Sequence, residues 1–338
     1  MKKNIMTTAT LLALTSLSST SALAFSNEPT VYGKANLALE KNAEGNQTGV
    51  TVNSNKSRIG FKGVIPVRNN LKALYKWEFE VVPDAKTSFN NRNQYVGLMG
   101  GFGTVFLGRH DSPYKMSQPN DLFNDGVFDN ASMTSVMKHG EDRFSNMLSY
   151  ITPNFSGVKL VGAFIPDEGS NSELKDSNLT DISSFALIYG SKKKGIFLSA
   201  GLNAYSQLKD RNGLIAQESS TLTRFSAQYN LYGLITNVIY QMDDEPRREG
   251  TTAIFNMGYE MGYMTPKLKI SNNTANKSSR NTGNVMAVGL DYELGKKTTA
   301  YFEFGTFDKQ LANNVKVSSE QDTRNSIEKY SIGLIHKF

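Results

Sequence analysis

GTVFLGRHDSPYKMSQPNDLFNDGVFDNASMTSVMKHGEDRFSNMLSYITPNFSG, residues 103–157, places a long irregular segment between two short alternating ones. The flanking segments, Thr104–Gly108 and Phe144–Ile151, are predicted to be β-strands. The segment between them, Asp111–Asp142, has 32 residues, whereas structureless loops longer than about 12 to 15 residues are uncommon in compact domains. We therefore expect this segment to have a function of its own.

The irregular segment is also acidic. It carries six carboxylates and two lysines, and an arginine stands near each end: Asp111, Asp121, Asp125, Asp129, Glu141 and Asp142; Lys115 and Lys138; Arg109 and Arg143. This charge predicts a loop folded into the lumen of a membrane β-barrel, where its carboxylates face a basic wall across a narrow aqueous pore. The alternative is a surface loop whose charges are solvated.

The N-terminus, Met1–Ala24, has the pattern of a secretory signal peptide, with a basic start, an apolar run and small residues before Phe25. We therefore expect a single mature domain, residues 25–338. Removing the two lysines of the signal peptide, and no acids, lowers the formal net charge from +6 to +4. This mild excess, without blocks of Lys and Arg, argues against nucleic acid as a partner.

After the signal peptide, the sequence has no apolar run long enough for a transmembrane helix, so any membrane crossing has to be made by strands in a closed barrel. The chain contains no cysteine, which excludes disulfides and thiolate metal sites. Its three histidines, His110, His139 and His336, are far apart and have no neighbours at metal-ligand spacing. We expect neither a metal site nor a cofactor.

Strict alternation supports strands. In Val31–Leu39, Arg58–Val64 and Leu71–Glu80, apolar residues occupy one face and polar or charged residues occupy much of the other. In a membrane barrel the apolar face meets lipid and the polar face lines the lumen.

The connections between such segments alternate in length. Seven short turns and eight long polar loops join sixteen predicted strands: turns at 66–70, 100–103, 153–157, 191–194, 230–231, 263–266 and 294–297, and loops at 41–56, 83–90, 111–142, 167–180, 207–219, 242–250, 271–282 and 310–324. Short turns at one rim and long loops at the other are typical of outer-membrane barrels. The predicted fold class is therefore an all-β, 16-stranded antiparallel transmembrane β-barrel with an inward-folded third loop.

With these features the sequence resembles the trimeric general porins of Gram-negative outer membranes, over the whole mature chain. The residues that carry the resemblance are short motifs in a fixed order: Val31–Lys34, Ser57–Gly63, Gly101–Thr104 with Leu107–Arg109, Ser149–Gly157 and Tyr330–Phe338. The resemblance implies a water-filled channel for passive diffusion of small hydrophilic solutes and ions, a homotrimer, and contact with outer-membrane lipid and lipopolysaccharide.

The resemblance also implies a set of pore residues. The basic side of the constriction falls on Lys34, Arg58, Arg109 and Arg143, and the acidic side on Asp121 and Asp125. Further lumen candidates are Lys62, Lys76, Arg92 and Asp129. The C-terminal Phe338 is expected to serve assembly, since relatives present a terminal aromatic strand to the insertion machinery.

Three departures from the family pattern bear on these expectations. The loop reads Leu122–Gly126 where enterobacterial relatives have Pro-Glu-Phe-Gly-Gly, and Ile335 replaces an inward arginine. Alternation from Val105 and Leu107 aims Arg109 outward unless a bulge intervenes. The sign of ion preference is left open by the sequence.

Two other functions compete with the channel. An adhesin or receptor barrel would use its loops rather than its lumen. A barrel hydrolase would need a serine, a histidine and an orienting acid together, and the sequence has no nucleophile motif. The sequence therefore favours a channel without enzymatic activity.

Overall fold

The computed structural model describes residues 29–44, 47–82, 88–132, 137, 139–166, 178–209, 215–246, 249–276, 282–308, 311 and 326–338. The predicted signal peptide lies outside these residues, as do parts of several predicted long loops. Among the residues described, no helix is long and apolar enough to cross a membrane.

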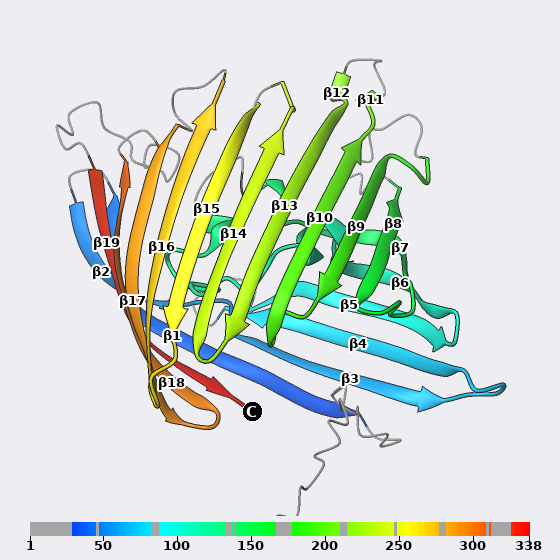
Figure 1. The fold of residues 1–338 in the computed structure, drawn as a ribbon, viewed down its shortest axis with the longest axis horizontal. Helices are drawn as coiled ribbons and strands as arrows, with labels where there is room; N and C mark the ends of the chain where they lie inside the picture. The colour runs from blue at the N-terminus through cyan, green and yellow to red at the C-terminus, as the bar shows by residue number, and fades with distance from the viewer. Residues whose placement is uncertain are drawn as a thin grey trace, which may run out of the picture.

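Nearly all of the described chain is β-strand (Figure 1). The strands are β1 Thr30–Glu44, β2 Gln47–Ser54, β3 Arg58–Pro66, β4 Lys72–Val81, β5 Phe89–Gly100, β6 Gly103–Asp111, β7 Arg143–Ile151, β8 Val158–Ile165, β9 Ile182–Gly190, β10 Gly195–Tyr205, β11 Leu208–Lys209, β12 Ile215–Gln217, β13 Ser220–Leu231, β14 Leu234–Asp243, β15 Gly250–Tyr259, β16 Met264–Ala275, β17 Gly283–Gly295, β18 Thr298–Asp308 and β19 Ser326–Lys337. Two short helices, α1 Pro113–Met116 and the 3₁₀-helix η1 Asn130–Ser132, lie between β6 and β7.

The strands form one closed antiparallel sheet, with the short β11–β12 hairpin apart from it. The barrel closes where β1 pairs with β19, from Lys34 opposite Lys337 to Glu40 opposite Ser331. One half of β1 pairs with β2 and the other half with β3, so these two short strands share one position in the wall. The 17 strands of the sheet therefore occupy 16 positions, which confirms the predicted sixteen-stranded antiparallel barrel.

The predicted first loop, residues 41–56, is wrong in its extent. Strand β1 continues to Glu44, and β2 pairs with it from Gln47 to Ser54. The sequence is largely polar here apart from Val50 and Val52, but backbone hydrogen bonds between strands do not require apolar side chains. A ladder can therefore continue beyond the part of the wall that meets lipid.

Side chains alternate across the wall as a membrane barrel requires. Leu198, Phe225 and Val238 point outward and are about half exposed, whereas Asn203, Gln241 and Asn256 point into the barrel and are buried. The outward face is thus suited to lipid, and the lumen is lined by groups that hydrogen-bond.

The C-terminal residue joins the barrel closure. The backbone N–H of Phe338 donates to Gly33 O at 3.1 Å, and the N–H of Gly33 donates to Phe338 O at 3.1 Å. A side chain at position 33 would collide with the ring of Phe338. The ring therefore lies over the glycine.

We expect Gly33→Ala to displace the Phe338 ring and to destabilise the barrel closure, by about 1 to 3 kcal/mol as overpacking generally does. The amount of heat-modifiable, folded protein on SDS gels measures this. Gly49→Ala is the matched control, because a Cβ at this strand position would meet nothing within 4 Å. Equal folding of the two variants would contradict the expectation.

Candidate pore constriction

The third loop, Ser112–Asp142, connects β6 to β7, and its described part, residues 112–132, 137 and 139–142, runs inside the barrel (Figure 1). It begins with α1, whose first turn is capped by Ser112: the hydroxyl accepts a hydrogen bond from Lys115 N at 3.0 Å. Inward side chains of successive strands then hold the loop backbone: Ser184 of β9 at Tyr114, Ser199 of β10 at Ser117, and Gln228 of β13 and Asn237 of β14 at Asn120. The loop thus follows the inner wall before it crosses the lumen.

Asp125 is the point where the loop meets β1 and β3. Its Oδ2 pairs with the ammonium of Lys34, and with Arg58 Nη1 at 3.2 Å. The Asp125 carbonyl accepts a hydrogen bond from Asn36 Nδ2 at 3.3 Å, and its backbone has a φ of 64°. An aspartate is among the residues that tolerate this left-handed conformation. Lys34 and Arg58 therefore pair directly with Asp125, whereas the sequence placed them facing this residue across the pore.

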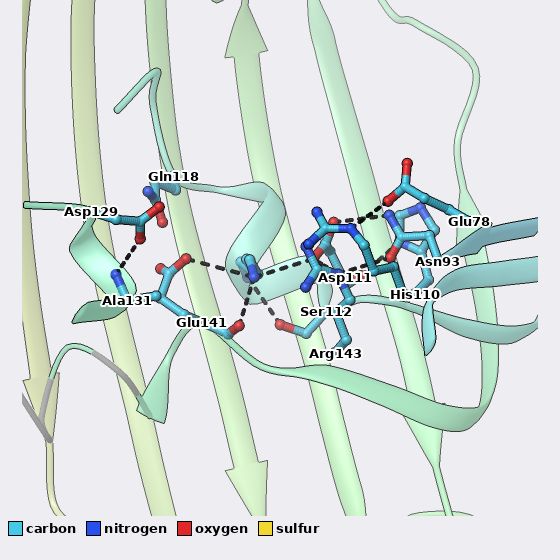
Figure 2. Close-up of polar contacts among 12 residues, drawn as sticks. Glu78, Asn93, His110, Asp111, Ser112, Gln118, Asp129, Ala131, Glu141 and Arg143 are labelled. Carbon is cyan, nitrogen blue, oxygen red and sulfur yellow. Dashed lines mark hydrogen bonds and ion pairs between the residues drawn. The ribbon is translucent and has the colours of Figure 1, made fainter. Parts of the chain in front are cut away.

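The other predicted basic residues on this side of the barrel pair with strand acids. Arg92 Nε contacts Glu78 Oε1 at 2.8 Å, Lys76 Nζ contacts Glu78 Oε2 at 3.1 Å, and Arg143 Nε contacts Asp111 Oδ1 at 2.9 Å. Figure 2 shows Arg143, Asp111 and Asn93 directed toward one another. We refer to Lys34, Arg58, Lys76, Arg92 and Arg143 as the basic wall.

The basic wall borders a cavity of about 430 Å³. The lining side chains include six basic and two acidic groups: Lys34, Arg58, Lys76, Arg92, Arg143 and Lys337, and Glu78 and Asp111. Close packing of like charges along one wall leaves a positive potential that the two carboxylates neutralise only in part.

Asp121 is not part of this arrangement. Its Oδ1 contacts Lys269 Nζ of β16 at 2.7 Å, and both side chains are almost fully buried. The same ammonium donates to Phe128 O at 2.7 Å and to Asn130 Oδ1 at 2.8 Å. The two predicted loop acids are thus separated: Asp125 faces the basic wall, and Asp121 fixes the loop to another part of the barrel.

Two further candidates lie away from the cavity. Lys62 of β3 places its ammonium 5.1 Å from the centre of the Tyr32 ring and is exposed. Arg109 is on the outward face of β6 with Leu107, and its Nη1 donates to Ser145 Oγ at 2.8 Å. The register of β5 and β6 continues unbroken through Arg109, so no bulge on β6 turns its side chain inward.

The loop acids Asp125 and Asp129 have opposite pKa shifts. Burial raises the pKa of Asp125, but the charges of Lys34 and Arg58 outweigh burial, and the pKa lies below its ordinary value. Burial and the nearby Asp121 carboxylate raise the pKa of Asp129 to about 6. Asp129 accepts hydrogen bonds from Asp125 N at 2.6 Å and Ala131 N at 2.7 Å, the second of which Figure 2 shows.

The raised pKa of Asp129 predicts pH-dependent packing of the third loop. Because the folded loop favours the protonated carboxyl, this stabilisation is complete below the ordinary pKa of 3.8 and is lost as pH rises through about 6. We expect the current noise of open channels to increase between about pH 5 and pH 7.5, and Asp129→Asn to remove the increase. Glu260→Gln, in an exposed turn, is the control. Persistence of the same pH dependence in Asp129→Asn would contradict this.

The sequence reasoning missed several buried charges that hold the loop. Lys267 Nζ contacts Glu303 and Asp291, both at 2.9 Å, and donates to Leu122 O at 2.9 Å. Arg224 is fully buried, and its Nη2 contacts Glu141 Oε1 at 2.9 Å. A signal was present for Lys267 and Lys269, which alternate with the apolar Leu268 and Ile270.

A closed barrel with an apolar exterior, a polar lumen and a loop crossing that lumen defines a pore-forming outer-membrane protein. The model of the Gram-negative porin family matches residues 8–310. The chain therefore belongs to this family, and it forms an outer-membrane channel for the passive diffusion of small hydrophilic solutes and ions. The predictions of family, fold class, channel function and location are confirmed.

Curated relatives and solved structures agree with the family. "Major outer membrane protein P.IB" of Neisseria gonorrhoeae is 27% identical over 282 residues, covering 77% of this chain and 80% of the relative. The protein of that name from Neisseria meningitidis serogroup A is 25% identical over 334 residues, covering 91% and 94%. The "Anion-selective porin from Comamonas acidovorans" has a TM-score of 0.71 at 18% identity and covers 92% of this chain and 99% of its own. The trimer form of OmpT from Vibrio cholerae has a TM-score of 0.61 at 13% identity, covering 92% and 99%.

Proposed function

We propose that the basic wall and Asp125 form the narrowest part of the pore, and that this constriction favours anions. The observation that carries the proposal is the lining of the adjoining cavity, where six basic side chains stand against two acidic ones. A wall of one sign raises the local concentration of counter-ions and lowers that of co-ions. The name of the Comamonas acidovorans porin states the same preference for that protein.

Arg58 is the side chain best placed to test this selectivity. It is partly exposed, with 22% of its side chain accessible, and it pairs with the loop at Asp125. The charge of Arg58 and a permeating ion about 8 Å away interact by about 2 kcal/mol in an effective dielectric of about 20. Before salt screening, this energy is enough to bias the choice between anions and cations several-fold.

We expect Arg58→Ser to move the reversal potential of planar-bilayer channels toward cations and to raise conductance modestly, because it removes charge and volume from the constriction. The measurement uses a salt gradient at low ionic strength, where screening is weak. Arg68→Ser removes an exposed arginine from the turn between β3 and β4 and is the matched control. An equal reversal potential in wild type and Arg58→Ser would reject Arg58 as a constriction residue, and a cation-preferring wild type would reject the proposed selectivity.

We further infer that the chain assembles as a homotrimer in contact with outer-membrane lipid and lipopolysaccharide, that it has no enzymatic step, and that its signal peptide is removed after Ala24. The trimer form of OmpT from Vibrio cholerae, a protein of similar fold, supports the homotrimer. Membership in a family of channels supports the absence of an enzymatic step. Sedimentation of the detergent complex tests the trimer, and N-terminal sequencing of protein from the outer membrane tests the cleavage site.

A further inference from the structure

A second cavity lies inside the barrel, between the third loop and the turn that joins β9 to β10. Its volume is about 900 Å³, within the range of small-molecule binding sites. Asp111 borders both this cavity and that of the basic wall, so the two cavities adjoin. We refer to the second cavity as the vestibule. Its lining comes from the loop, from β7 to β10 and from the turn.

The carboxylates of the vestibule are neutralised by ion pairs of their own. Each of the three acids that border it has a basic partner at 2.7 to 2.9 Å: Asp111 with Arg143, Glu141 with Arg224, and Asp121 with Lys269. Lys115 of the loop adds contacts to Asp111 at 3.3 Å and to Glu141 at 3.9 Å. The acids therefore have little negative potential left to offer to other cations.

Three further lysines line the vestibule without a carboxylate partner among the described residues. Lys159 of β8 and Lys193 of the turn form no ion pair within the described part of the chain. Lys192 donates to the neutral Met116 O at 3.0 Å, and its ammonium lies 5.0 Å from the centre of the Phe197 ring. Burial lowers the pKa of Lys192 to about 8, so an anion beside this ammonium would offset its desolvation. We refer to Lys159, Lys192 and Lys193 as the vestibule lysines.

Lys159 points into the vestibule. Leu160, the next residue of β8, is outward and 53% exposed, whereas Val161 is inward and 3% exposed. Alternation places Lys159 on the face of Val161. Its cross-strand partner is Ile188 of β9, which also lines the vestibule. The ammonium of Lys159 thus lies on a stretch of wall that is apolar.

Apolar side chains accompany the vestibule lysines. Met116, Ile151 and Ile188 line the vestibule and are partly exposed. We refer to these three residues as the apolar strip. The lumen of a water-filled barrel is generally lined by polar groups, and apolar surface that faces water is stabilised when an apolar ligand covers it. The strip therefore favours a ligand with an apolar part.

The turn that carries two of the vestibule lysines is fixed in place. Lys192 O accepts hydrogen bonds from Asn120 Nδ2 of the loop at 2.8 Å and from Gln228 Nε2 of β13 at 2.6 Å. Asn230 Nδ2 donates to Lys193 O at 3.0 Å. These bonds hold the backbone of both lysines in the absence of a ligand, which lowers the ordering cost of binding.

We propose that the vestibule is a binding site for small organic carboxylates with an apolar body, in which the vestibule lysines hold the carboxylate and the apolar strip contacts the body. An ammonium is a compact point charge, so it selects the sign of the ligand and not its shape. The apolar strip then selects for the body. The site rests on the proposed anion preference, which lets such ions reach the vestibule, and it adds a class of substrate to it.

Block of the chloride current tests the site, with the intact protein in planar bilayers. The probes are benzoate and acetate, which carry the same charge at neutral pH and differ in their apolar body. We expect benzoate to halve the current at a concentration roughly tenfold or more below that of acetate, because its ring covers the apolar strip.

Removing the two lysines that form no ion pair should weaken this block. We expect Lys159→Gln with Lys193→Gln to raise the half-blocking concentration of benzoate by roughly tenfold, since the variant removes two charges beside the ligand. The matched control is Lys194→Gln with Lys297→Gln, which removes the same charge from turn positions that do not border the vestibule. All four lysines are exposed, so these replacements leave the packing of the barrel unchanged. The control should be blocked as the wild type is.

Equal block of the wild type by benzoate and acetate would overturn the site, and so would equal block of the two double variants by benzoate. The reversal potential in a chloride gradient, measured on the same membranes, tests the constriction separately. A wild type that prefers cations, but is still blocked by benzoate through Lys159 and Lys193, would overturn the proposed selectivity and support the vestibule site.

Discussion

Replacing Lys269 by Met should give channels with larger and noisier conductance, because the central part of the third loop loses its three contacts with this side chain of β16 and keeps only that of Lys267 with Leu122 O. The ammonium of Lys269 lies 2.7 Å from Asp121 Oδ1, 2.7 Å from Phe128 O and 2.8 Å from Asn130 Oδ1. All three acceptors belong to the loop. Met has a similar length and no hydrogen-bond donor, so the variant removes these contacts with little change in volume.

The expected effect on the loop is large. Lys269 and Asp121 have side-chain exposures of 0% and 2%, and removing one partner of a buried ion pair costs about 3 to 5 kcal/mol because the other charge stays buried and uncompensated. The barrel itself should persist, since the backbone hydrogen bonds of β16 with β15 and β17 do not involve this side chain. Single-channel recording measures the conductance, and heat-modifiability measures the barrel.

The double variant Lys269→Met with Asp121→Asn is the control for this experiment. The backbone N–H groups of Phe123 and Asn130 donate to different oxygens of Asp121, Oδ1 at 3.0 Å and Oδ2 at 2.8 Å. Asn keeps an acceptor for only one of them, but it leaves no buried charge. We expect the double variant to recover part of the wild-type conductance and quiet baseline. A single Lys269→Met variant that conducts as the wild type does would show that other contacts hold the loop.

The sequence predicted the barrel because its cause is local. Alternation of apolar and polar residues follows from one face meeting lipid and the other meeting water, and it can be counted along each strand. The family motifs also pointed to Lys34 and Arg58 as residues on the side of the lumen that faces Asp125, although not to their direct ion pairs with it. Both results depend on information close to the residues concerned.

The partner of Asp121 could not be predicted in the same way. Lys269 is 148 positions away in the sequence, and the two meet only because the barrel closes and the loop crosses the lumen. The end of the strand that carries Lys269 is also predicted wrongly, because residues 271–275, predicted as loop, belong to β16. Contacts across a lumen depend on barrel size and loop path, and neither appears as a local pattern.

Register shifts explain the remaining differences on the basic wall. The pairing of β4 with β5 shifts between Trp77 and Phe79, which places an extra residue on β5 at Arg92 and Asn93. The pairing of β6 with β7 shifts opposite Ser145 and Asn146, and Asn146 has a φ of 54°. Such bulges turn side chains by one position. They bring Asn93 to Asp111 and Arg143, a contact that strict alternation does not reveal.

Deleting Phe338 should lower the amount of folded protein in the outer membrane far more than it changes the conductance of the channels that form. Phe338 and Gly33 exchange two backbone hydrogen bonds of 3.1 Å at the barrel closure, and the ring covers Gly33 and is 50% exposed. Loss of two such hydrogen bonds and of a half-buried ring amounts to about 3 kcal/mol.

The permeation pathway should be affected much less by this deletion. Phe338 borders the cavity beside Lys337 at the end of β19 and pairs with none of the ion-pairing side chains at Asp125. Phe338→Tyr, which keeps the ring and the backbone pairing, is the matched control and should fold as the wild type does, whereas Phe338→Ala keeps only the backbone pairing and should give an intermediate yield. Heat-modifiable protein in outer-membrane fractions measures folding, and planar bilayers measure conductance. Wild-type amounts of folded protein after the deletion would show that the other pairs of β1 with β19, from Lys34 to Glu40, are enough to close the barrel.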